Sequence, residues 1–166
     1  MSGMNDDSCV RPPFFPLFIA SGFGAGYSPV APGTAGALVA VLLWAVAALF
    51  VPFAVLQAAL AAVVVLFTTL GVWSGTVMER YWGEDPSKVV VDEMVGVWIP
   101  LLAVPENYGL FYTLAAFVLF RFFDIVKPLG VRRMERFKGG WGIMADDILA
   151  GVYSAILLVA ARFILH

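Results

Sequence analysis

The sequence predicts an all-α fold: a polytopic membrane helix bundle of about five transmembrane helices, preceded by a segment rich in glycine and proline. Two observations support this prediction. Apolar residues make up 61% of the 166 positions and charged residues only 13%, whereas a soluble domain has about 25% charged residues. In addition, no charged residue occurs between Arg11 and Glu79. A soluble protein would have to bury that whole stretch, but a bilayer requires no polar cover for it.

The first half of the chain predicts two membrane spans and one shorter apolar piece. A spanning helix needs about 20 mostly apolar residues, which rise about 1.5 Å each. The first candidate runs from Thr34 to about Phe50. Pro52 separates it from the second, Phe53 to Met78, because proline breaks a helix. The shorter piece, Phe14–Ala20, is expected to lie in the membrane interface or to enter the bilayer part of the way.

Three further spans are expected in the second half of the chain. They are Val89–Val104, Tyr108–Asp124 and Ile143–Ile164. The first carries Asp92 and Glu93, which we place two turns inside the helix. The last carries Asp146 and Asp147, which we place in its first turn.

We expect one transmembrane domain, residues 14–166, after a polar tail of residues 1–13. The tail lacks a basic, an apolar and a small-residue region in the right order, so no cleaved signal peptide is expected. The single cysteine, Cys9, lies in this tail and cannot form an internal disulfide. A net charge of −2 gives no basic footprint, so nucleic acid is not expected as a partner.

The positions of lysine and arginine predict the orientation. The turns near Pro52 and Pro105 carry none, whereas the loop from Glu79 to Lys88 and the loop after the fourth span are basic. With five spans, the N-terminus and both basic loops share one side, which the rule makes cytoplasmic. Nine of the ten basic residues fall on that side, with Arg162 opposite. The glycine-rich stretch, the start of the third span, the end of the fourth and the start of the fifth all meet there, so we predict a site at this face.

The stretch from Gly22 to Gly36 is rich in glycine and leads into a helix. Glycines let backbone N–H groups approach an anion, and a helix start adds a favourable dipole. Ser28, Gly33 and Thr34 are therefore candidate phosphate-binding residues, with Thr34 alternatively capping the helix. The other interpretation is a Gly/Pro loop that precedes a tightly packed membrane helix. No lysine and no preceding strand are present, so this is not a nucleotide-binding loop.

Asp92 and Glu93 indicate function, because an ionised carboxylate inside an apolar helix is costly without a partner. The alternative places both at the headgroup level, where they are hydrated. Asp85, which is followed by Pro86, fits the cap and first position of a helix and is expected to be structural.

Arg121, Asp124 and Lys127 follow one another at intervals of three residues. The first two share a helix face, and Lys127 lies past the turn that precedes Pro128. Either Arg121 and Asp124 form a simple ion pair, or Asp124 binds a metal while Arg121 and Lys127 bind phosphate. A later basic cluster is expected to bind anionic headgroups. It consists of Arg132, Arg133, Arg136 and Lys138.

Two adjacent carboxylates, Asp146 and Asp147, are more than a helix cap requires, which favours a functional role. The alternative is that acidic residues in a first turn interact favourably with the helix dipole. Asp147 and Gly151 share a helix face at a spacing of four, and so do Asp92 and Gly96. A small residue below each carboxylate predicts that these faces pack inward, away from lipid.

The residue types that are absent from the predicted site exclude some kinds of catalysis. The only histidine, His166, lies at the far end of the chain, and Cys9 has no phosphate loop near it, so histidine and cysteine nucleophiles are not expected. Carboxylates with basic residues remain, and oxygen ligands suit Mg²⁺, which polarises a phosphoryl oxygen and activates water. The residues alone therefore indicate a metal-assisted phosphate site. The rival interpretation is an ion or solute transporter with intramembrane carboxylates.

At these residues the chain resembles the phosphatidylglycerophosphatase A family of bacterial inner-membrane enzymes. The matching pieces extend in order from about Ala20 to Ala155. They are Gly22-Phe23-Gly24, Ser28-Pro29, Pro32-Gly33-Thr34, Asp92-Glu93, Gly96, Trp98, Arg121, Asp124, Lys127-Pro128, Gly140 to Met144, Asp146-Asp147 and Ala150-Gly151. The resemblance implies Mg²⁺-dependent hydrolysis of a phospholipid substrate, phosphatidylglycerophosphate, to phosphatidylglycerol and inorganic phosphate. Gly130 replaces an expected proline, which should alter the shape of that loop.

The expected roles follow from this reading. Asp92, Glu93, Asp124, Asp146 and Asp147 would bind Mg²⁺, and Glu93, Asp124, Asp147 and Lys127 would be the catalytic groups. Arg121 and Lys127 would bind the terminal phosphate, with Ser28, Gly33 and Thr34 as further contacts. Neighbouring helix residues point about 100° apart, so one carboxylate of each pair should bind the metal directly while the other orients it. An activated water and an aspartyl-phosphate intermediate both fit the sequence.

Overall fold

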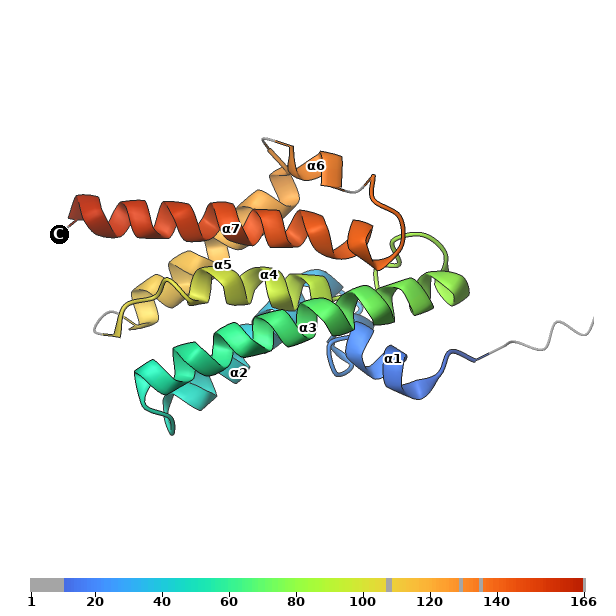
Figure 1. The fold of residues 1–166 in the computed structure, drawn as a ribbon, viewed down its shortest axis with the longest axis horizontal. Helices are drawn as coiled ribbons and strands as arrows, with labels where there is room; N and C mark the ends of the chain where they lie inside the picture. The colour runs from blue at the N-terminus through green and yellow to red at the C-terminus, as the bar shows by residue number, and fades with distance from the viewer. Residues whose placement is uncertain (1–10, 107–108, 129, 135, 166) are drawn as a thin grey trace, which may run out of the picture.

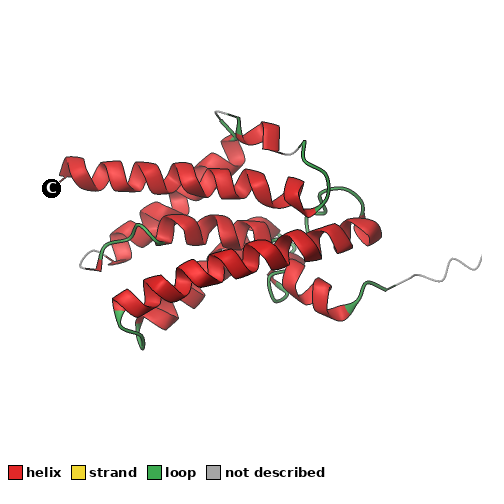
Figure 2. Ribbon diagram, in the orientation of Figure 1, coloured by secondary structure: helices red, strands yellow, loops and turns green. Residues whose placement is uncertain are grey.

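The computed structural model describes residues 11–106, 109–128, 130–134 and 136–165 (Figure 1). This part of the chain contains helices and no strands, which confirms the predicted all-α class (Figure 2). The helices are α1 (Phe14–Ala20), the short 3₁₀ helix η1 (Ala25–Tyr27), α2 (Pro32–Ala48), α3 (Phe53–Trp82), α4 (Val91–Leu101), α5 (Gly109–Val126), α6 (Val131–Met134) and α7 (Gly140–Leu165). Cys9, the predicted start of the fourth span at Tyr108, and His166 lie outside the described residues.

The short helix α4 lies at the centre of the bundle. It runs between α3 and α7 in Figure 1, and it also packs against α2 and α5. All of its residues except Glu93 and Ile99 are buried. The apolar sequence of α4 is therefore covered by protein.

Three helices, α3, α5 and α7, are long and apolar enough to cross a membrane. The other two predicted spans are shorter, because α2 has 17 residues and α4 has 11. A helix of the length of α4 rises about 16 Å, against a hydrocarbon core of about 30 Å. The predicted count of about five spans is therefore not confirmed. Hydropathy alone does not distinguish a short helix buried in protein from one that is buried in lipid.

Two predicted helix starts are wrong, and both errors concern an acidic pair. Helix α4 begins at Val91, so Asp92 and Glu93 lie in its first turn and not two turns inside. Helix α7 begins at Gly140 and has no acidic residue in its first turn, so Asp146 and Asp147 lie farther inside. The helix dipole therefore favours the pair on α4, whereas it does not explain the pair on α7.

Two predicted helix caps are also wrong. Val90 occupies the N-cap of α4, while Asp85 lies in the preceding loop with a φ of +45°. Ala31 occupies the N-cap of α2, and no side chain caps that helix, so Thr34 is not a cap. The loop before α4 is held by backbone bonds, because Val90 N–H donates to Ala20 O at 2.8 Å.

Helices α4 and α7 touch through two glycines. A Cβ atom at Gly151 would overlap the backbone oxygen of Gly96, and a Cβ atom at Gly96 would lie 2.9 Å from the backbone oxygen of Asp147. Only glycine permits this approach, so the prediction that the Gly96 and Gly151 faces pack inward is confirmed. The crossing brings the first turn of α4 beside Asp147.

Side-chain hydrogen bonds fix the position of α4 against its neighbours. The indole nitrogen of Trp98 donates to Ala40 O of α2 at 3.1 Å. Gln57 of α3 donates to Leu101 O at the end of α4, also at 3.1 Å. A third bond joins α3 to α7, where Gly140 N–H donates to Thr76 Oγ1 at 2.8 Å. Each of these bonds satisfies a polar group that would otherwise be costly in an apolar bundle.

Candidate active site

A cavity of about 700 Å³ opens at the end of the bundle where α2, α4 and α7 begin and where α3 and α5 end. Acidic and basic side chains line it. The charged lining residues are Glu79, Glu84, Asp85, Asp92, Glu93, Asp124, Lys127, Arg136, Lys138, Asp146 and Asp147. The predicted convergence of four separate parts of the chain at one end of the bundle is confirmed.

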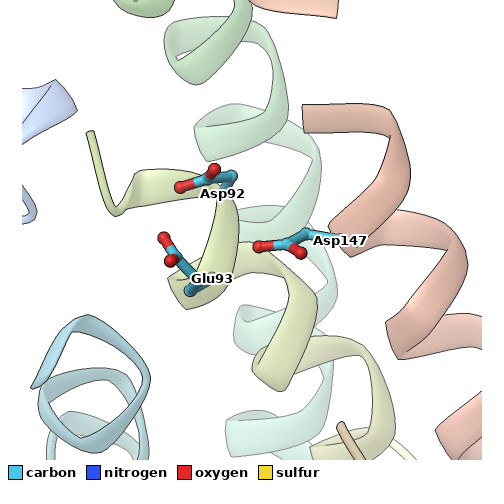
Figure 3. Close-up of side chains that lie close together, drawn as sticks. All are labelled: Asp92, Glu93 and Asp147. Atoms are coloured by element: carbon cyan, nitrogen blue, oxygen red, sulfur yellow. The ribbon is translucent and has the colours of Figure 1, made fainter. Parts of the chain in front are cut away.

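Three carboxylates form the floor of this cavity. Figure 3 shows Asp147 of α7 pointing toward the pair Asp92 and Glu93 of α4, and one oxygen of each residue lies within 4.8 Å of the others. Asp92 and Asp147 are buried, with only 8% and 3% of their surfaces exposed. Asp92 Oδ1 and Glu93 Oε2 have no hydrogen-bond partner among the described residues.

These carboxylates require a positive charge or protons between them. Two unit charges about 4.8 Å apart repel each other by about 3 kcal/mol at an effective dielectric constant of about 20. The buried oxygens without partners are hard ligands of the kind that Mg²⁺ binds. Asp92, Glu93 and Asp147 could therefore hold a divalent cation, and the donor set fits Mg²⁺.

The start of α2 lies against Glu93. A Cβ atom at Gly33 would overlap Glu93 Oε1 and would lie 2.9 Å from its Cδ. The absence of a side chain at Gly33 thus makes room for the carboxylate, and the positive end of the α2 dipole favours it there. The sequence offered this helix start as a candidate phosphate site; a side-chain carboxylate lies beside it in the structure, and a role for Gly33 in binding phosphate stays a prediction.

The other two residues predicted beside Gly33 lie outside the cavity wall. Neither Ser28 nor Thr34 lines the cavity. The Ser28 hydroxyl donates to Val30 O at 2.9 Å, which is a local turn contact. A role for these two side chains in binding substrate stays a prediction, and the geometry gives it no support.

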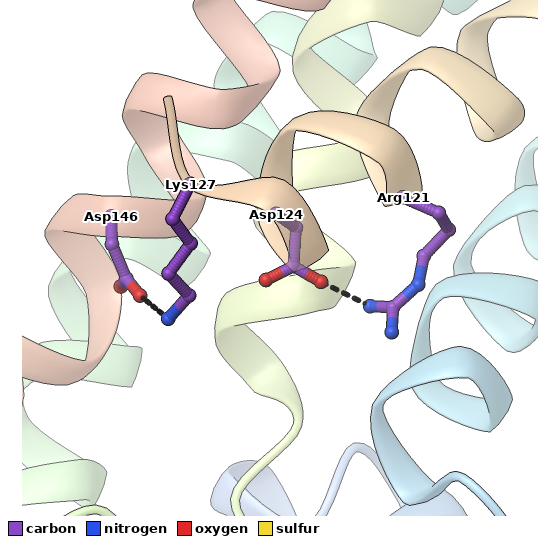
Figure 4. A network of polar contacts seen from close by, with 4 residues as sticks. All are labelled: Arg121, Asp124, Lys127 and Asp146. Atoms are coloured by element: carbon purple, nitrogen blue, oxygen red, sulfur yellow. Dashed lines mark hydrogen bonds and ion pairs between the residues drawn. The ribbon is translucent and has the colours of Figure 1, made fainter. Parts of the chain in front are cut away.

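Two ion pairs connect the other predicted charged site residues (Figure 4). Arg121 Nη1 lies 2.5 Å from Asp124 Oδ2, and Lys127 Nζ lies 2.6 Å from Asp146 Oδ2. The predicted ion pair between Arg121 and Asp124 is present. Arg121 does not line the cavity, whereas Asp124 and Lys127 do. Asp124 also interacts electrostatically with Glu93 and Asp147.

The adjacent acids separate on one helix and not on the other. On α7, Asp147 joins the carboxylate cluster while Asp146 contacts Lys127, as the angle between neighbouring helix residues predicts. On α4, Asp92 and Glu93 both reach the cluster. Which of the five acids would bind a metal directly stays a prediction.

Sequence reasoning missed the mouth of the cavity. Arg136 and Lys138 line it on one side, and Glu79, Glu84 and Asp85 line it elsewhere. The sequence suggested a headgroup anchor for the first two and a helix cap for Asp85. Their position in the sequence could have revealed them. One of these loops comes directly before α4 and the other directly before α7, and these two helices carry the acidic pairs. Gly130, which replaces the expected proline, has a φ of +95° that proline cannot adopt.

Comparison with known proteins gives one consistent family. The sequence profile of phosphatidylglycerophosphatase A matches residues 18–162. Proteins described as phosphatidylglycerophosphatase A from Escherichia coli K12 and Haemophilus influenzae are 40% and 37% identical, over 84% and 87% of this chain and 79% and 87% of their own. A Bacteroides thetaiotaomicron protein, described provisionally as a phosphatidylinositol-3-phosphatase, is 61% identical over 93% of this chain and 98% of its own. No solved structure matches the chain significantly.

Proposed function

The chain belongs to the phosphatidylglycerophosphatase A family, a family of phosphatases, and from this premise we propose that it removes the phosphate monoester of phosphatidylglycerophosphate with the help of Mg²⁺ at the cytoplasmic leaflet. The products are phosphatidylglycerol and inorganic phosphate. The observation that supports this proposal is the cluster of Asp92, Glu93 and Asp147 on the floor of a charged cavity.

In this proposal Asp92, Glu93 and Asp147 hold Mg²⁺. The bound ion would polarise a phosphoryl oxygen and activate water. The fit rests on the unpartnered buried oxygens of Asp92 and Glu93 and on the electrostatic cost of leaving three carboxylates together without a cation.

The neighbouring side chains bind and orient the reactants. Lys127 lies in the cavity wall and neutralises charge on the phosphoryl oxygens. Asp146 holds the Lys127 ammonium at 2.6 Å and so fixes its position. Asp124 accepts the proton of the attacking water, and Arg121 holds the Asp124 carboxylate in place. Arg121 thus acts through Asp124, which differs from the phosphate-binding role that its spacing suggested.

We also propose five membrane crossings with the cavity on the cytoplasmic side. Helices α3, α5 and α7 are long enough to cross alone, and α2 has 17 residues. Because its neighbours bury α4, that helix need not match the hydrocarbon thickness, and irregular backbone at its ends is tolerated inside protein. Five crossings place nine of the ten basic residues on the cavity side, in agreement with the positive-inside rule.

A second candidate substrate, phosphatidylinositol-3-phosphate, is suggested by the relative that is 61% identical, because that protein is described provisionally as a phosphatidylinositol-3-phosphatase. Both lipids carry a phosphate monoester on a headgroup that a phosphodiester joins to the glycerol backbone. The reaction centre would therefore hydrolyse the same kind of bond in both lipids. The lipids differ in the group that lies between the two phosphates.

Phosphate release from the protein purified in detergent micelles tests the proposal. The wild type should release phosphate from phosphatidylglycerophosphate with Mg²⁺ and should stop when EDTA is added. Glu93→Gln and Asp147→Asn should each lower kcat by at least about 100-fold. Glu106→Gln is the matched control, because Glu106 is an exposed carboxylate that lines a separate cavity between α2, α3 and α5.

Three results would contradict the proposal. Turnover that persists in EDTA would show that the reaction needs no metal ion. Wild-type turnover in Glu93→Gln would show that the carboxylate cluster takes no part in the reaction. The absence of phosphate release from any phospholipid, together with cation transport in vesicles, would favour the transporter. Faster hydrolysis of phosphatidylinositol-3-phosphate than of phosphatidylglycerophosphate would assign the second substrate.

A further inference from the structure

The loop between α6 and α7 places two cations and an aromatic ring at the mouth of the cavity. Arg136, Phe137 and Lys138 are consecutive, and all three line the cavity. All three side chains are exposed, Phe137 to 56%. An exposed aromatic ring between two cations suits the boundary between headgroups and acyl chains.

The end of this loop is anchored to the body of the bundle. Gly139 has a φ of +69°, and the next residue, Gly140, donates its N–H to Thr76 Oγ1 of α3 at 2.8 Å. A Cβ atom at Gly140 would overlap the backbone oxygen of Val72. The two glycines therefore hold the end of the loop directly against α3, and Lys138 stays close to the cavity.

The charge on the cavity wall is distributed unevenly. Glu79, Glu84 and Asp85 come from the end of α3 and the loop after it, and they repel an anion. Of the lining residues, the cations are Lys127, Arg136 and Lys138. Lys127 is paired with Asp146, so the exposed Arg136 and Lys138 are the lining cations that an approaching anionic headgroup meets first.

We propose that Arg136 and Lys138 bind a second phosphate, the phosphodiester of the same lipid whose monoester lies at the carboxylate cluster. This inference rests on the proposed function and adds the residues that recognise the part of the headgroup that is not hydrolysed. Helix α7 rises about 9 Å from Gly140 to Asp146, at about 1.5 Å per residue. Long arginine and lysine side chains bridge part of that distance, so a headgroup with two phosphates spans the rest. Phosphatidylglycerophosphate and phosphatidylinositol-3-phosphate both meet this requirement.

The same phosphodiester chemistry could come from a neighbouring membrane lipid, and the chain itself contains the control that separates the two sources. Arg132 and Arg133 lie on α6, are exposed, and do not line the cavity. A membrane surface would attract all four cations alike. The substrate's own phosphodiester would depend on Arg136 and Lys138 alone.

Product inhibition in neutral detergent micelles tests the proposal. Phosphatidylglycerol keeps the phosphodiester and inorganic phosphate replaces the monoester, so the two products probe the two ends of the cavity. In Arg136→Gln/Lys138→Gln, the KM for phosphatidylglycerophosphate and the inhibition constant of phosphatidylglycerol should each rise about 10- to 100-fold. The kcat and the inhibition constant of inorganic phosphate should stay within about 2-fold, which also reports an intact reaction centre. Arg132→Gln/Arg133→Gln should leave all four values unchanged.

A binding measurement makes the test independent of turnover. Native mass spectrometry should detect phosphatidylglycerol retained by the wild type and by the α6 variant, and lost from the loop variant. Equal losses in both double variants would assign the cations to the membrane surface and overturn the proposal. Unchanged binding in the loop variant, or a fall in kcat at unchanged KM, would overturn it as well. If the wild type released no phosphate from any lipid, the proposed function would fail, whereas the binding comparison would still decide whether a phosphodiester occupies the loop.

Discussion

Replacement of Gly33 by alanine should disable the reaction centre and leave the fold intact. The new Cβ atom would overlap Glu93 Oε1, and Glu93 Cδ would have to retreat from 2.9 Å to an ordinary contact distance of at least 3.4 Å. Functional constellations tolerate displacements of about 0.5 Å, and a misplacement of about 1 Å costs about 100-fold in rate. Because the Oε1 overlap is the more severe one, we expect kcat to fall by about 100-fold.

The stability of the same variant should change little. Alanine is favoured over glycine in a helix by about 1 kcal/mol, which offsets part of the strain of moving Glu93. The free energy of unfolding should therefore change by less than about 1 kcal/mol. Gly109→Ala is the matched control, because Gly109 also lies near the start of a helix and its Cβ would meet nothing within 4 Å. Thermal unfolding in detergent and phosphate release with and without Mg²⁺ measure both effects.

A second substitution tests the cause of the loss. Aspartate at position 93 is one methylene shorter and leaves room for the Cβ atom at position 33. Gly33→Ala/Glu93→Asp should therefore be no less active than Glu93→Asp alone, which is strong non-additivity in a double-mutant cycle. Wild-type activity in Gly33→Ala, or fully additive losses in the double variant, would refute the reasoning that Gly33 makes room for Glu93.

Three further predictions concern the groups around this centre. Asp146→Asn should raise KM about 10-fold with a smaller effect on kcat, because Lys127 loses the carboxylate that positions it. A large fall in kcat together with weaker Mg²⁺ binding would instead identify Asp146 as a metal ligand. Gly151→Ala should force α4 and α7 apart at the Gly96 backbone oxygen and lower the free energy of unfolding by about 1–3 kcal/mol, seen as a lower midpoint of thermal unfolding. Asp147→Asn should raise the free energy of unfolding in EDTA by about 1–3 kcal/mol, because one buried charge is removed. It should also abolish the stabilisation that Mg²⁺ gives the wild type. An unchanged response to Mg²⁺ would contradict the assignment of Asp147 as a metal ligand.

The sequence predicted which residues would meet, and it misjudged how the backbone presents them. Spacing placed Asp92 with Gly96 and Asp147 with Gly151 on inward faces, and the glycine crossing of α4 and α7 confirms this. The depth of the two acidic pairs was reversed. Before α4, Asp85 and Pro86 fit a helix start by residue type, but they lie in the preceding loop. Before α7, hydropathy predicted a start at Ile143, whereas Gly140 and Trp141 already belong to the helix.

The contacts that could not be predicted are those that depend on three-dimensional register. Gly33 and Glu93 are far apart in the sequence, and nothing in the pattern of either segment requires that they touch. The same is true of Thr76 and Gly140, whose hydrogen bond fixes the basic loop. In both cases a glycine marks a position where another group approaches closely, but the identity of that group depends on how the helices pack.

The distribution of positive charge around the site indicates where a cation is most needed. Asp92 and Glu93 lie in the first turn of α4, where the helix dipole favours carboxylates. Arg121 pairs with Asp124, and Lys127 pairs with Asp146. Asp147 is different, because it lies inside α7 and its electrostatic neighbours in the described part of the chain include Glu93, Asp124 and Asp146, all of them acids. A carboxylate that is 3% exposed and surrounded by other acids is stable as an anion only beside a cation. In the proposed mechanism a metal ion is therefore needed most beside Asp147, and the closely packed glycines of α4 and α7 keep that residue close to Asp92 and Glu93.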